Sequence, residues 1–139
     1  MFLTRVFFIT LFLCISAVSG PVFSAIQILP YSYAGNYKGT LYYPEPMTQK
    51  MGVIIYNYDE YFTQFGKESA KEHGYDIDEI ARLFMLKGYL LFVPERTSET
   101  TLAIQGAILA MRKHPYVDAQ RIHMMGISIG ASLSILSTV

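Results

Sequence analysis

The segment Met124-Met-Gly-Ile-Ser-Ile-Gly-Ala-Ser-Leu-Ser-Ile-Leu136 contains the pattern Gly-x-Ser-x-Gly at Gly126, Ser128 and Gly130. The preceding residues, Arg121–Met125, predict a strand, and the apolar segment after the second glycine predicts a helix. A serine between them occupies a sharp strand-to-helix turn, where side chains two residues away would collide with neighbouring backbone. Glycine at both positions removes the collision. The sequence therefore predicts a strained turn that lifts the Ser128 hydroxyl above the end of a sheet.

This turn predicts a chemistry as well as a shape. The start of a helix directs unpaired N–H groups and the positive end of the helix dipole towards the serine oxygen. We expect the backbone amide of Ile129 to stabilise the negatively charged oxygen of a tetrahedral intermediate. Such an intermediate forms when an ester, thioester or amide is cleaved, so Ser128 is interpreted as a nucleophile. The alternative is that two glycines and a serine merely form a tight turn.

Apolar segments upstream of the motif predict further strands. Val53–Tyr56 and Leu90–Val93 show no alternation of apolar and polar residues, which is typical of parallel strands buried on both faces. The earlier segments Ala25–Leu29 and Tyr37–Tyr43 predict an antiparallel hairpin, and Pro44-Glu-Pro46 is expected to end its second strand.

Two helices are predicted between these strands and the motif. The first begins at Asp76-Ile-Asp-Glu79, which has the layout of a capping box, and ends before Gly88. The second is expected to be capped by Thr97 or Ser98, and Pro115 prevents it from continuing. Alternating strands and helices with right-handed crossovers predict an α/β fold of three layers with a mostly parallel sheet.

The first 25 residues have the layout of a secretory signal peptide. Arg5 precedes the apolar segment Val6–Ile15, and small residues follow as far as Ala25. Because the apolar segment is short for a membrane span, we predict cleavage after Ala25 and export to the periplasm or the extracellular space. An uncleaved membrane anchor is the alternative, and no stable membrane span is expected after cleavage. The single cysteine, Cys14, lies in this segment, so no disulfide is expected in the mature chain.

Composition and spacing exclude several other functions. The chain has 11 Lys and Arg against 11 Asp and Glu, so nothing indicates a basic surface for a nucleic-acid partner. Glu68, Glu72 and His73 lack the spacing of an H-E-x-x-H site and are interpreted as a solvated helical face, so no metal is predicted. No glycine-rich phosphate loop or dinucleotide fingerprint follows the strand at Val53, and no cofactor is expected.

From about Met51 onward the chain resembles the α/β-hydrolases, nearest to dienelactone-hydrolase-like proteins and exported esterases or peptidases. Besides the serine motif, His114–Ile122 resembles the segment that leads into the nucleophile strand of that family. The resemblance implies a serine hydrolase with a small-molecule or peptide acyl substrate. It also implies a second oxyanion amide in the loop at residues 57–60. We predict that the backbone amide of Tyr58 is this donor, with the amide of Asp59 as the alternative. The His-Gly-Gly sequence of many esterases is absent from this loop.

The acid and the histidine of a catalytic triad follow the serine in this family. Only eleven residues follow Ser128, and none is Asp, Glu or His. Upstream, His123 is interpreted as a packed core residue, and His73 and His114 as surface or capping residues. We therefore predict that residues 26–139 are the N-terminal portion of an α/β-hydrolase domain, with the acid and base beyond it. The alternative is a non-catalytic hydrolase remnant or a secreted binding module.

Overall fold

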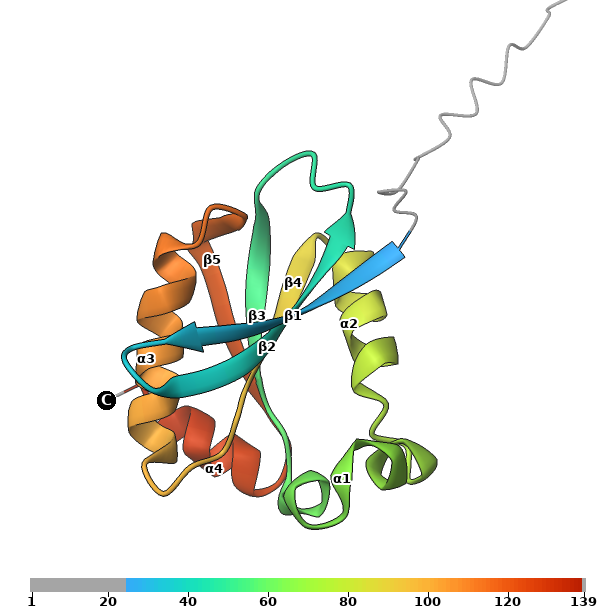
Figure 1. Ribbon diagram of the computed structural model, residues 1–139, viewed down its shortest axis with the longest axis vertical. Coiled ribbons are helices and arrows are strands. Elements are labelled where there is room, and N and C mark those ends of the chain that lie inside the picture. Colours follow the sequence, from blue (N-terminus) through green and yellow to red (C-terminus); the bar gives the residue numbers. More distant parts are fainter. Residues whose placement is uncertain (1–24, 139) are drawn as a thin grey trace, which may run out of the picture.

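A computed structural model describes residues 25–138, which form strands and helices in alternation after an opening hairpin (Figure 1). The predicted signal peptide lies outside the described residues, apart from Ala25 in the first strand. Within residues 25–138, no helix has the length and apolar character that a bilayer span requires. The elements are β1 (Ala25–Tyr33), β2 (Tyr37–Glu45), β3 (Met51–Asn57), α1 (Glu60–Glu72), α2 (Ile77–Met85), β4 (Tyr89–Pro94), α3 (Thr100–Lys113), β5 (Val117–Gly126) and α4 (Ile129–Leu136).

The described strands form one mixed sheet in the order β1-β2-β4-β3-β5. β3 pairs in parallel with both β4 and β5, whereas β2 runs antiparallel to both β1 and β4. The predicted hairpin and parallel strands are confirmed. β2 ends at Glu45, within the segment Pro44-Glu-Pro46, as predicted, and β4 pairs only with Gly39–Tyr42. At Pro44, β2 has one neighbouring strand, and an edge position tolerates the missing N–H.

Helices cover both faces of the sheet, which confirms the three-layer α/β fold. Figure 1 shows α3 and α4 on one side of the sheet and α2 on the other. Every residue of β3 is buried, because this strand lies between two parallel neighbours and under helices on both faces. Alternate residues of β3 therefore enter two cores. Val53, Ile55, Ile104 and Met111 belong to the core under α3, and Ile54, Tyr56, Ile77 and Met85 to the core under α2.

The predicted helix starts are right for α2 and wrong for α3. The Asp76 carboxylate accepts the N–H groups of Asp78 and Glu79, as a cap should. The residue before α3 is Glu99, which makes no side-chain capping bond. Thr97 instead accepts the Glu99 N–H at 3.1 Å, which forms a local turn ahead of the helix.

The sequence predicted only part of α1, the solvated helical face with Glu68, Glu72 and His73, which are exposed at its end. Gly66, with φ 81° and ψ 176°, divides it into two short helical pieces, and the only residue that α1 buries fully is Ala70. Each piece is therefore too short to show the sustained apolar spacing that predicts a helix from sequence. Ion pairs attach the second piece to the start of α2, with Lys67 Nζ 2.7 Å from Asp78 and Lys71 Nζ 3.2 Å from Asp76.

His114 ends α3 and is buried, so the expectation of a capping residue is right and that of a surface residue is wrong. Its ring lies between those of Tyr31 and Tyr116, at centroid distances of 5.5 and 5.4 Å. Its Nδ1 accepts the Tyr116 N–H at 3.3 Å, which requires the neutral imidazole. Burial lowers the pKa of His114 below its ordinary value.

Folding stability is expected to fall in mild acid because of His114. The unfolded chain binds a proton at this imidazole near pH ~6.5, whereas the folded chain binds it only at lower pH. Stability should therefore be lost as pH falls through the unfolded pKa. Urea unfolding midpoints measured across this range should decline in the wild type and in the exposed-site control His123→Asn. The same decline in His114→Asn would contradict this assignment.

Candidate active site

Ser128 lies in the turn between β5, which ends at Gly126, and α4, which begins at Ile129. Its φ of 55° and ψ of −124° belong to a region that residues with a side chain rarely adopt. The residue is exposed, so this strained backbone is not caused by burial of the side chain. The turn therefore has the geometry of an elbow that holds its hydroxyl out from the sheet.

Two close backbone approaches explain the glycines on either side of Ser128. A Cβ at Gly126 would overlap the backbone of Gly130. A Cβ at Gly130 would overlap the carbonyl group of Asn57 and lie 2.7 Å from the Tyr58 carbonyl oxygen. The first turn of α4 is thus pressed against both the end of β5 and the loop that follows β3.

Buried polar side chains fasten the same two segments together. Asn57 Nδ2 donates to Ser134 Oγ at 2.7 Å, and Ser134 Oγ donates to the Gly130 carbonyl at 2.9 Å. The Ile127 N–H donates to the Asn57 carbonyl at 3.2 Å, which extends the pairing of β3 with β5 into the turn. The end of β3 and the start of α4 are therefore held in fixed register around Ser128.

Ser134→Ala should destabilise the protein more than Ser137→Ala does, by about 1–3 kcal/mol, because it leaves the buried Asn57 amide without its acceptor. Ser137 is the matched control, since it is also a buried serine of this helical segment and also donates to the carbonyl four residues earlier. Urea unfolding of both variants measures the difference. Equal losses of stability would show that the contact between Asn57 and Ser134 contributes nothing.

Tyr58, the predicted second oxyanion residue, is held by Arg96, which the sequence analysis did not single out. The Arg96 guanidinium donates to the Tyr58 carbonyl and lies over the Tyr58 ring, 5.0 Å from its centroid. The Arg96 backbone N–H also donates to Tyr58 Oη at 3.2 Å. Arg96 lies two residues after the end of β4, and a polar residue at the carboxyl end of a buried parallel strand is a signal that could have identified it.

The other predicted donor, Ile129, is the first residue of α4, so no carbonyl one helical turn earlier is available to its N–H. The next amide, of Gly130, bonds to the Ile127 carbonyl at 2.9 Å. Asp59, the alternative to Tyr58, is the N-cap of α1, and its carboxylate accepts the Phe62 N–H at 3.2 Å.

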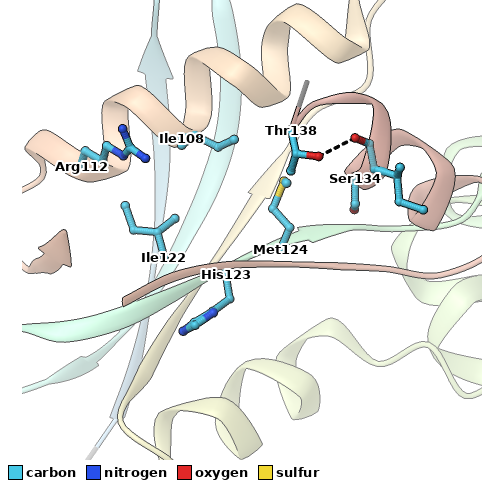
Figure 2. A pocket seen from close by; sticks show the side chains of 8 residues that line it. Ile108, Arg112, Ile122, His123, Met124, Ser134 and Thr138 are labelled. Carbon is cyan, nitrogen blue, oxygen red and sulfur yellow. Dashed lines mark hydrogen bonds between the residues drawn. The ribbon is translucent and has the colours of Figure 1, made fainter. Parts of the chain in front are cut away.

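The three histidines lie in different surroundings. His73 bonds to Tyr61 Oη, and His114 is buried beside Tyr31. His123 is exposed with its ring 5.5 Å from that of Tyr89, so its interpretation as a core residue is wrong. It points away from the sheet face that carries α3 (Figure 2). Among residues 25–138, Ser128 makes no side-chain hydrogen bond to any of these histidines.

The same described residues contain no group of three or more His, Cys, Asp or Glu placed to hold a metal ion.

A cavity of about 520 Å³ lies along β5 rather than at Ser128 (Figure 2). It occurs where β5 is the last strand of the sheet, between the helices α3 and α4. Ser128, Ile129 and Tyr58 do not line it. The lining residues are Ile108, Arg112, Ile122, His123, Met124, Ser134, Ile135 and Thr138.

Comparison with known proteins finds similarity in structure alone. No family model matches the sequence, and no curated protein matches it closely. A thermostable esterase from Pseudomonas putida aligns with a TM-score of 0.58 at 12% identity, over 80% of this chain and 36% of its own. One fungal esterase structure from Rhizomucor miehei aligns with a TM-score of 0.61 at 18% identity, over 82% and 38% of the two chains.

A dienelactone-hydrolase-like phosphotriesterase from metagenomic libraries aligns with a TM-score of 0.58 at 14% identity, over 82% of this chain and 54% of its own. The chain thus spans between 36 and 54% of the length of these solved structures. Together with the strand order and the crossovers, these alignments show that the described residues have the α/β-hydrolase fold.

Proposed function

We propose that this chain supplies the nucleophile and the oxyanion hole of a serine hydrolase that cleaves an ester, thioester or amide. The observation that carries the proposal is the backbone of Ser128, an exposed serine at φ 55° between the end of β5 and the start of α4. A strained backbone is retained where its surroundings impose it, and such sites cluster where chemistry needs them. The hydrolase neighbours of the fold support the same reaction class.

In the proposed reaction, Ser128 Oγ attacks the acyl carbon of the substrate, and the π electron pair of the carbonyl group moves onto the carbonyl oxygen. The Ile129 amide and the Tyr58 amide, or that of Asp59, donate to this oxyanion. Collapse of the intermediate expels an alcohol, thiol or amine and leaves an acyl group on Ser128. Water then releases the acid. The substrate is a small-molecule or peptide acyl compound.

The serine proton needs a base, and the base needs an orienting carboxylate. We propose that residues outside 1–139 supply both, because the described histidines contact other side chains and the chain spans half or less of most structural neighbours. The N-terminal signal pattern supports the further proposal that the protein is exported, to the periplasm or the extracellular space.

Acylation by an activated ester tests the proposal. With p-nitrophenyl acetate and no added base, the purified chain should release at most about one equivalent of nitrophenol, and slowly, because acylation and deacylation both need a base. Added imidazole, a diffusible base, should accelerate the release beyond the rate at which imidazole alone cleaves the ester. Peptide mass spectrometry should place the acetyl group on Ser128, and the exposed-serine control Ser98→Ala should behave as the wild type does.

The rival function, a non-catalytic remnant or binding module, predicts a different result. The elbow would then be a structural turn, and Ser128→Ala would release nitrophenol at the wild-type rate, with and without imidazole. That outcome would remove the proposed nucleophile.

A further inference from the structure

Arg96 contacts Tyr58 in three ways. Its guanidinium donates to the Tyr58 carbonyl, its charge lies over the ring, and its backbone N–H donates to the phenol oxygen. Tyr58 is 8% exposed, so these contacts are formed largely out of water, where a charge-assisted hydrogen bond is strong. A single residue from the end of β4 thus holds the backbone, ring and hydroxyl of Tyr58.

The contact fixes a peptide plane that the sheet leaves free. The Asn57 carbonyl bonds to the Ile127 N–H, which orients the peptide before Tyr58. The peptide after Tyr58 lies beyond the last register pair of β3 with β5, Asn57 with Gly126, and its carbonyl bonds to Arg96 instead. Because a peptide is planar, fixing both carbonyls fixes both amides, those of Tyr58 and Asp59.

This fixed residue lies against the elbow. The Tyr58 carbonyl oxygen would be 2.7 Å from a Cβ at Gly130, so it faces the first turn of the helix that starts beside Ser128. Without the arginine, rotation of the peptide between Tyr58 and Asp59 would displace the Asp59 amide, the alternative second donor. Oxyanion stabilisation depends on donors that are already oriented before the charge develops.

We propose that Arg96 is a positioning residue of the oxyanion hole, which holds the loop after β3 so that the Asp59 amide, the alternative second donor, faces the oxyanion formed at Ser128. This inference rests on the proposed function. Lysine should replace Arg96 poorly, because an ammonium can donate to the carbonyl but lacks the planar guanidinium that stacks on an aromatic ring.

Phosphonylation of Ser128 by a fluorophosphonate tests the proposal, since the adduct places a phosphoryl oxygen where the oxyanion would form. With imidazole present, Arg96→Ala should lower the limiting rate about 10- to 100-fold at nearly unchanged probe affinity, approaching the loss of an oxyanion donor. Arg96→Lys should react at a rate between those of the wild type and Arg96→Ala. Added methylguanidinium should restore part of the rate that Arg96→Ala loses. The control is Arg82→Ala, whose arginine pairs with the exposed Glu79 on α2.

The possible outcomes separate the two proposals. Wild-type labelling that Ser128→Ala abolishes, with Arg96→Ala labelled as fast as Arg82→Ala, overturns the role of Arg96 alone. Labelling that persists in Ser128→Ala overturns the proposed function as well. If the alanine variant does not fold by circular dichroism, the folded lysine variant decides, and a wild-type rate in that variant also overturns the positioning role.

Discussion

Replacing Gly130 with alanine is expected to lower the free energy of unfolding by about 3 kcal/mol or more, the upper range for inserting a methyl group into packed structure. The added Cβ would overlap the Asn57 carbonyl group, which is backbone and is itself bonded to Ile127. Neither the added methyl group nor the Asn57 carbonyl can therefore move away unless α4 separates from β3. Urea unfolding followed by circular dichroism measures the loss.

Ser132→Ala is the control for Gly130→Ala, because it alters an exposed residue of the same helix and should change stability by less than about 0.5 kcal/mol. A Gly130→Ala protein as stable as this control would mean that α4 does not press against the end of β3 as described. The geometry of the elbow would then be wrong as well.

Ser128→Gly and Ser128→Ala should both reduce acylation by an activated ester at least about 100-fold, since each removes the proposed nucleophile. Their stabilities should differ. Glycine adopts the observed φ of 55° freely, so Ser128→Gly should gain about 1–2 kcal/mol, whereas alanine retains the strain. Paired measurements of nitrophenol release and urea unfolding test both effects.

Measuring stability and acylation together is informative, because a serine with a purely structural role predicts the opposite changes in both. If Ser128 served packing alone, its glycine variant would lose stability and acylation would be unaffected. A gain in stability together with a loss of acylation is the pattern expected where strain is retained for chemistry.

The parts of the fold that were predictable are those encoded locally. Val53–Tyr56 and Leu90–Val93 are unbroken apolar segments, and they form the buried strands β3 and β4. Asp76 caps α2 because its carboxylate reaches amides two and three residues ahead. The helix α1 was predicted only at its end, as a solvated helical face, because Gly66 interrupts it and few of its residues are buried.

The serine motif was also readable from the chain, because its two glycines stand at fixed spacing around Ser128. Its supports were not readable, since they join residues far apart in sequence. Asn57 meets Ser134 across 77 positions, and Tyr58 meets Arg96 across 38. Only the crossovers of the fold bring these residues together. The prediction that His123 is a core residue was wrong, because β5 is the last strand of the described sheet and its residues can face solvent.

A crystal structure of the chain after reaction with a fluorophosphonate would test the central claim, that Ser128 is a nucleophile beside a preformed oxyanion hole. We expect phosphorus bonded to Ser128 Oγ, with its phosphoryl oxygen about 2.7–3.1 Å from the Ile129 nitrogen. Phosphorus on another residue, or on Ser128 with its phosphoryl oxygen turned away from the start of α4, would contradict it.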